Sequence, residues 1–433
     1  MSSSFFVFLS LIINLIWILK SFVQLPIAPK LFNLPVIFSI LFLLYYTQNV
    51  FLSEIVFNIP VKQWLPLSIN EKSNAYTFLM SYLTIFWIAY VVHAPTQNYK
   101  GNLFKLNYAS AGLVWLIMIS SIFSIYVHST GGIYEFITNH REAIYRNQWS
   151  NSADVIIVNK IRVIASLMFT AAAISGGYFL AVDDRAKIWQ KILYFILPLP
   201  GAIVKIALLS RGAFLYYALF FLTKSVASRK KQQFFFLKLI VLSLIALLGV
   251  IYGMVERSNN EIILSSLDES VLFVSNSING MQTFFDTFAI SKFESGIEIF
   301  RIILELSPIP SFIFSSPYVS NLTTLIFGNS SGSSTPMPFI GEAYFNLGWA
   351  GLILAYLQGL LSALINSKVA NPFICDRFWW ILLYVATVYS FIYMPHSGIR
   401  SCTRPMVWVV IFFAMVRFVR LIMPDQPYHS SKK

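Results

Sequence analysis

Four charged side chains near the C-terminal end have the types and the spacing for chemistry on an anion: Glu342, His396, Arg400 and Arg404. The last three are four residues apart, so a helical turn would align them on one face, although a nearby glycine and proline make that alignment conditional. Paired arginines bind phosphate-like oxygens through charge-assisted hydrogen bonds. This stretch therefore predicts an anion-binding site.

Arg211 is a further candidate, because it lies between two apolar stretches. An arginine in that position is unfavourable in lipid unless it faces a water-filled cavity or an anionic partner. The polar segment 128–160 adds Arg141 and Arg146 as weaker candidates. Glu142 and Arg146 also have the spacing of an ion pair on a solvated helix, which is the favoured explanation for that segment.

The strongest candidates have structural explanations too. Arg211 can anchor a helix end at the membrane interface by extending its side chain to water. Glu342 would lie in the first turn of a helix, where the helix dipole stabilises a carboxylate by about 0.3–1 kcal/mol. Arg400 and Arg404 can contact lipid headgroups, but two arginines in an outer loop oppose the tendency of basic residues to stay in the cytoplasm. That pair is therefore favoured as functional.

The elements that position these residues belong to a chain with the composition of an integral membrane protein. Of 433 residues, 57% are hydrophobic and 11% are charged, and the mean hydropathy is +0.69. A soluble domain carries about a quarter charged residues. Apolar runs near the roughly 20 residues that cross a bilayer recur, and in lipid such runs are helical so that backbone amides are bonded internally. They do not alternate, so the predicted class is all-α.

We expect about eleven transmembrane helices, within a range of about ten to twelve. The basic loops 183–191 and 228–238 belong in the cytoplasm, which places the N-terminus outside and the C-terminus inside. The net charge of +13 is then spread over cytoplasmic loop ends, which implies no nucleic-acid partner. The expected spans are 5–23, 31–50, 75–93, 106–127, 161–182, 192–209, 212–227, 235–253, 340–365, 378–395 and 405–423.

This topology divides the chain into three parts. Residues 1–253 hold eight transmembrane helices with an outer loop at about 128–160. Residues 254–338 form a large outer loop with short helices on or in the outer leaflet, and 339–433 hold three helices and a short cytoplasmic tail. Loops of this length in compact proteins usually carry function.

A ladder of small residues, Gly351, Ala355, Gly359 and Ala363, recurs at every fourth position of one expected span. Small residues at this spacing let two helices approach closely. The ladder predicts a helix-packing face and no chemistry.

Several motifs of other chemistries are missing. The sequence has no phosphate-binding Walker loop, no outer Asp-x-Asp pair, no zinc spacing and no Gly-x-Ser-x-Gly turn. We therefore expect neither a metal nor a cofactor. The two cysteines, Cys375 and Cys402, are expected on opposite faces of the membrane, so no disulfide framework is predicted.

Two motifs and the overall plan resemble the O-antigen polymerases, the Wzy family of oligosaccharide repeat-unit polymerases. The motifs are Ser-Arg-Gly-Ala-Phe at 210–214 and Pro-x-x-Gly-Glu-Ala-Tyr-x-Asn-x-Gly-x-x-Gly at 338–351. The resemblance implies a GT-C-like enzyme of the Gram-negative inner membrane with its active site facing the periplasm. It would join undecaprenyl-pyrophosphate-linked repeat units into O-antigen or a related polysaccharide, and release undecaprenyl pyrophosphate.

The resemblance also implies roles for the candidate residues. Arg211, Arg400 and Arg404 would stabilise the pyrophosphate leaving group, where negative charge develops. Glu342 or His396 would be the base for the acceptor hydroxyl. Arg141, Arg146 and Tyr344 would contribute to substrate binding. The expected partners are the lipid-linked oligosaccharides and membrane lipids, and a chain-length regulator is a candidate.

Two alternatives remain open. An O-antigen ligase, or a polymerase of another lipid-linked glycan, would share the general plan, but the stretch 330–335 lacks the histidine expected of a ligase. A flippase or transporter of lipid-linked oligosaccharides would show charges deep within spans and short loops on both faces, whereas these charges cluster at outer ends.

Overall fold

The described part of the chain is almost entirely helical. The computed structural model describes residues 1–24, 33–94, 109–138, 153–183, 186–207, 215–228, 280–291, 326, 337–371, 376–395 and 397–422, and it has no strand among them. This confirms the all-α class. Seven segments within these ranges are long and apolar enough to cross a membrane: Ser3–Lys20, Leu34–Val56, Ile69–His93, Ala111–Ser129, Ile164–Val182, Ile188–Ala207 and Phe339–Ala370.

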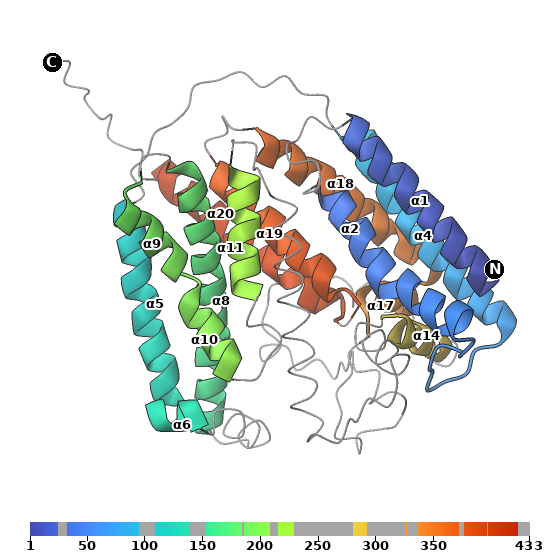
Figure 1. Cartoon of the computed structure of the whole chain (residues 1–433), viewed down its shortest axis with the longest axis horizontal. Coiled ribbons are helices and arrows are strands. Elements are labelled where there is room, and N and C mark those ends of the chain that lie inside the picture. The colour runs from blue at the N-terminus through green and yellow to red at the C-terminus, as the bar shows by residue number, and fades with distance from the viewer. Residues whose placement is uncertain are drawn as a thin grey trace. The chain divides into compact units, whose positions relative to one another are not determined.

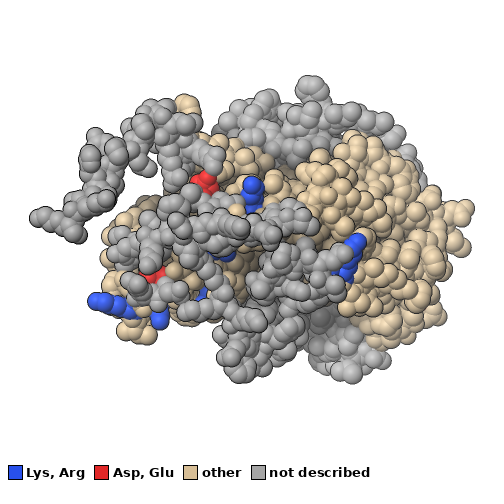
Figure 2. Space-filling model, turned by 90° about the horizontal axis from the view of Figure 1, so that it is seen from above, with Lys and Arg blue, Asp and Glu red and all other residues tan. Residues whose placement is uncertain are grey.

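The described surface agrees with this character. Among the described residues visible in Figure 2, lysine, arginine, aspartate and glutamate form isolated spots between residues of other types. Helix α1 (Ser3–Gln24) exposes large apolar side chains such as Phe8 and Leu15, which would be unfavourable in water and suit lipid. The predicted total of about eleven spans stays a prediction, since the expected span 235–253 lies outside the described residues.

The chain forms two compact units, residues Met1–Lys100 with Ser266–Lys433, and residues Gly101–Ser265. The first unit contains the helices that position the candidate site (Figure 1). Besides α1 they are α2 (Leu34–Phe42), α4 (Ile69–His93), α14 (Met281–Ile290), α17 (Phe339–Leu347), α18 (Leu352–Ala370), α19 (Arg377–Tyr393) and α20 (Ile399–Ile422). Helix α2 continues as the π-helical turns η2 (Leu43–Thr47) and η3 (Phe51–Val56), with α3 (Gln48–Val50) between them.

Helices α4 and α18 are packed closely through small side chains. Ala355 and Ala363 of α18 are buried, and a Cβ added to Gly359 would clash with the carbonyl oxygen of Phe86 and lie 2.8 Å from the Cβ of Ala89. Gly359 therefore lets the two backbones approach. The helix-packing face predicted by the ladder of small residues is confirmed.

A partly buried carboxylate joins three elements at the other end of α4. Glu54 of η3 accepts hydrogen bonds from the hydroxyl of Tyr76, at 3.2 Å, and from Ser3 of α1, and its Oε1 lies 3.6 Å from the Nζ of Lys72. These bonds compensate the carboxylate for lost hydration. Glu54 therefore fixes how α1, η3 and α4 lie against one another.

The second unit consists of α5 (Ala109–Ser129), α6 (Ile133–Thr138), α8 (Ala153–Val182), α9 (Ile188–Ile196), α10 (Leu199–Ala207) and α11 (Leu215–Ala227). Helices α8 and α11 meet at Gly177, where a Cβ would clash with the carbonyl oxygen of Phe220. Helix α8 begins at Ala153, within the segment 128–160 that we expected to be a loop. The expected spans 192–209 and 212–227 coincide with α9, α10 and α11, and the turn between α9 and α10 precedes the helix-breaking Pro200.

Prediction: Gly359→Val lowers the free energy of unfolding of the purified protein by about 1–3 kcal/mol or more, because the added side chain forces α4 and α18 apart. The measurement is denaturant unfolding in detergent micelles. The matched control is Leu357→Val, which puts the same β-branched residue at a position of α18 that is 50% exposed. Equal stability of the two variants would show that the close approach at Gly359 contributes little.

Candidate functional site

The candidate site is built around residues 394–395 and 397–399, which lie between α19 and α20 and are called the turn 394–399 below. The first turn of α17 holds this turn at both ends. The backbone N–H of Phe339 donates to the carbonyl oxygen of Met394 at 2.8 Å, and the N–H of Ile399 donates to the Oε2 of Glu342 at 2.6 Å. Segments about 60 residues apart in sequence are thereby fixed to each other.

Glu342 is almost completely buried, with 1% of its side chain exposed. It lies in the first turn of α17, as the sequence predicts, but its carboxylate interacts with the start of a different helix, α20. The first amides of a helix lack partners within the helix and form its positive end, so this contact is favourable for a carboxylate. Sequence reasoning identified the residue and missed its partner.

Helix α14 packs against the same turn and against α17. The Oγ1 of Thr283 donates to the carbonyl oxygen of Pro395 at 3.4 Å, and a Cβ on Gly341 would lie 3.1 Å from the side chain of Thr287. Tyr344 stacks on Phe288 with ring centroids 4.2 Å apart. Helix α14 belongs to the segment 254–338, where we expected helices on or in the outer leaflet. Its described side chains are mostly buried within the first unit, and its place relative to the leaflet stays a prediction.

Arg400 and Arg404 lie in the first turns of α20. This helix runs from Ile399 to Ile422 with Pro405 inside it, so Arg400 and Arg404 are one helical turn apart. The conditional expectation of a helical register for this pair is confirmed. Arg404 is partly buried. The positive end of α20 and both arginines therefore gather positive charge near the turn 394–399.

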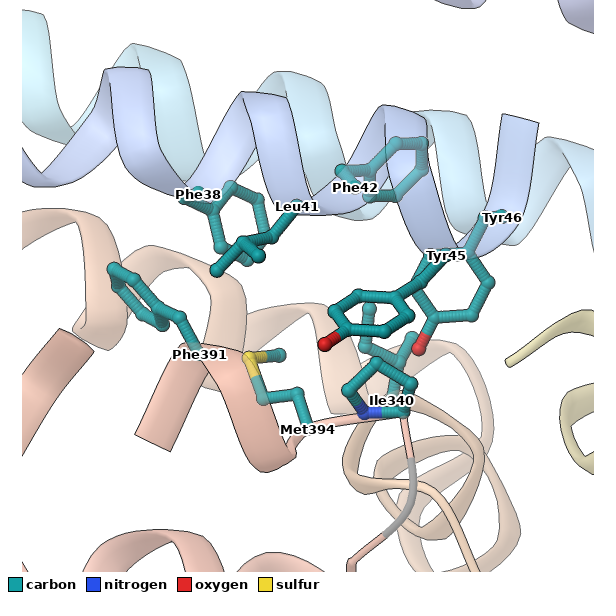
Figure 3. A pocket seen from close by; sticks show the side chains of 9 residues that line it. Phe38, Leu41, Phe42, Tyr45, Tyr46, Ile340, Phe391 and Met394 are labelled. Carbon is teal, nitrogen blue, oxygen red and sulfur yellow. The ribbon is translucent and has the colours of Figure 1, made fainter. Parts of the chain in front are cut away.

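An apolar crevice reaches the same turn from the side of α2 (Figure 3). Phe38, Leu41 and Phe42 come from α2, whereas Phe391 and Met394 face them from the end of α19. Tyr45 and Tyr46 extend their hydroxyl groups toward Ile340 and Met394. Pro395 completes the lining, so one wall of the crevice is the turn that precedes the arginines.

Asp286 is a buried acid of α14 that sequence reasoning missed. Its Oδ1 accepts hydrogen bonds from the backbone N–H groups of Trp64, at 2.8 Å, and Leu65, at 3.1 Å. Its Oδ2 is buried and has no hydrogen-bond partner among the described residues. Burial raises the pKa of Asp286 to about 6, and the two backbone hydrogen bonds oppose the shift. The available signal was an acid within the run 284–290, which is otherwise apolar except for Thr287.

The structure brings together only part of the predicted set. Glu342, Arg400, Arg404 and Tyr344 all lie on α17 or on the start of α20, close to the turn 394–399. The backbone alone is described for Arg400. Tyr344, predicted to contact substrate, stacks on Phe288 and meets the ring of Phe78 edge-on at 4.8 Å, and its predicted role stays a prediction. The remaining candidates lie outside the described residues: His396, Arg211, Arg141 and Arg146.

Prediction: ionisation of Asp286 alone lowers the free energy of unfolding by about 3 kcal/mol as the pH rises from below 4 to above 6. The reason is that, with its pKa raised, the folded state binds the proton more tightly than the unfolded state does. This contribution is fully present below the ordinary pKa of 3.8 and is lost as the pH passes 6. Asp286→Asn removes it, since the amide never ionises.

The measurement is unfolding of wild type and Asp286→Asn in detergent between pH 4 and pH 8. The variant gains stability relative to wild type as the pH rises. Glu135→Gln, at a partly exposed site of α6, serves as the control for removal of a carboxyl group. A stability difference between wild type and Asp286→Asn that does not change with pH would contradict the prediction.

Comparisons with known proteins return no relative. The sequence matches no protein-family model and no curated protein, and the structure matches no solved structure.

Proposed function

We propose that this chain is a membrane glycosyltransferase that polymerises lipid-pyrophosphate-linked oligosaccharides. The observation that carries the proposal is the shared position of two features. The turn 394–399 forms one wall of an apolar, aromatic crevice and also leads directly into the arginine-bearing start of α20. A substrate with a long hydrocarbon chain next to a pyrophosphate needs such a neighbourhood.

The two features differ in the part of the substrate they suit. Leu41 and Tyr45 are partly exposed and would meet a polyprenyl chain that lies against the mouth of the crevice, whereas Phe38 and Phe391 are each 3% exposed and form its floor. Arg404, with Arg400 one turn before it, lies at the positive end of α20 and suits the pyrophosphate. Tyrosine hydroxyl groups at the crevice suit the polar groups at the boundary between the two.

The proposed reaction is a displacement at the anomeric carbon of the growing glycan. A hydroxyl oxygen of the incoming repeat unit forms the new glycosidic bond, while the bond from the anomeric carbon to the pyrophosphate oxygen breaks. Undecaprenyl pyrophosphate leaves with the bonding electron pair, and the hydroxyl proton passes to a base. Arginines placed where negative charge develops lower the barrier to this step.

The resemblance to the O-antigen polymerases extends the proposal. In that setting the enzyme is a GT-C-like protein of the Gram-negative inner membrane, with its site at the periplasmic face. Glu342 and His396 are the two alternatives for the base, and Arg211 belongs to the proposed site as a further pyrophosphate ligand. A chain-length regulator is a candidate partner.

Prediction: purified protein in liposomes elongates lipid-linked repeat units isolated from its native host, without added nucleotide. The energy comes from the pyrophosphate linkage of the donor, so no sugar nucleotide is needed. The readout is a ladder of products on a polysaccharide gel. Movement of these lipids across the bilayer without elongation would support a transporter and overturn the proposal.

Prediction: Arg404→Ala lowers the turnover number of this elongation by about 100- to 1,000-fold, because one charged donor to the leaving group is lost. Arg404→Lys recovers only part of the rate, since an ammonium lacks the planar pair of donors. Lys368→Ala removes a cation from the last turn of α18 and serves as the matched control. Normal product ladders from Arg404→Ala would remove this residue from the site.

A further inference from the structure

The Glu342 carboxylate occupies a position that suits support of α20 better than proton transfer. Ile399 is the first residue of α20, so its N–H has no carbonyl partner within the helix. The Oε2 of Glu342 satisfies it at 2.6 Å, a short distance typical of a charge-assisted hydrogen bond. This bond connects α17 directly to the helix that carries Arg400 and Arg404.

The residue before Ile399 leaves room for the carboxylate. A Cβ added to Gly398 would clash with the Oε2 of Glu342. The carboxylate therefore lies against the bare backbone of the turn, and any larger residue at 398 would displace it. The glycine that made a helical alignment conditional in the sequence has a specific role in this packing.

A base for the acceptor hydroxyl must come within hydrogen-bond distance of that hydroxyl, at about 2.6–3.2 Å. Glu342 is 1% exposed, and its Oε2 is already bonded to a backbone amide. Its Oε1 is buried as well, so neither carboxylate oxygen is open to an acceptor sugar in this structure. The position argues against direct contact with substrate.

We propose that Glu342 is a positioning residue: it fixes where α20 begins and thereby orients Arg400 and Arg404. The second bond from α17, between Phe339 and Met394, holds the opposite end of the same turn. If Glu342 is a positioning residue, His396 is the remaining candidate for the base that accepts the proton of the acceptor hydroxyl. The inference rests on the proposed function for the identity of the substrate, whereas the support of α20 stands on geometry alone.

The first test measures that support without any activity. Cys402 is buried one turn into α20, and its Sγ donates to the carbonyl oxygen of Ser397 at 3.4 Å. In a Cys375→Ser background, Glu342→Ala and Gly398→Ala raise the rate of maleimide labelling of Cys402 at least tenfold, because each releases the first turn of α20. Glu342→Gln, which keeps an oxygen acceptor, stays near wild type.

Glu54→Ala is the matched control, since it also removes a hydrogen-bonded carboxylate, here a partly buried one, from the same unit. It leaves the labelling rate of Cys402 unchanged. Labelling at the wild-type rate in both Glu342→Ala and Gly398→Ala would overturn the proposed support of α20.

The second test separates positioning from base catalysis, with host-derived lipid-linked repeat units as the probe. For a positioning residue, Glu342→Gln keeps turnover within about tenfold of wild type with an unchanged pH profile, and Gly398→Ala reproduces the larger defect of Glu342→Ala. Loss of the base would lower the turnover number by about 100- to 10,000-fold in Glu342→Gln and remove the acidic limb of the profile. That result, with near-normal turnover in Gly398→Ala, would overturn the proposal.

If the wild-type protein does not elongate the repeat units, the proposed function fails, and the labelling experiment still decides the role of Glu342 at α20.

Discussion

The hydrogen bond between the Glu342 carboxylate and the Ile399 amide is the contact on which the arrangement of the candidate site depends. The bond gives a partner to the first amide of α20, which has none within its own helix. It also gives a donor to a buried carboxylate, whose burial without a donor would be unfavourable. The turn between α19 and α20 is thereby fixed to α17, and α14 packs onto that turn and onto α17. The start of α20 takes its place from this connection, while the Phe339–Met394 bond holds the crevice wall and Asp286 also fixes α14.

Apolar helices in lipid gain little from burial against each other, because lipid tails are as apolar as leucine. Two other kinds of contact give the first unit its specific packing. Close backbone approach at Gly359 joins α4 to α18. Hydrogen-bonded acids join elements that are remote in sequence, as the partly buried Glu54 does for α1, η3 and α4, and as the buried Asp286 does for α14 and the segment before α4. An acid left without its donors would carry a large desolvation penalty, so each one selects a particular arrangement.

The candidate site combines opposite environments within one turn of chain. Met394 and Pro395 contribute to the apolar crevice, and four residues later Ile399 opens the helix whose first turns carry the arginines. This proximity is the physical basis for proposing a substrate that is both lipid and phosphate. The aromatic side chains of the crevice add rigid, shape-specific surface with few rotatable bonds.

Local sequence determined the properties that depend only on nearby residues. Runs of about 20 apolar residues determined the helical class and the helices found at the expected spans within the described ranges, because a lipid-embedded backbone must bond to itself. The repeat of small residues determined the packing face of α18, and four-residue spacing determined the register of Arg400 and Arg404. Tertiary structure alone decided that Glu342 serves α20 and that Asp286 binds amides 221 and 222 residues away. Such partners depend on the path of the whole chain, so a local sequence pattern cannot predict them.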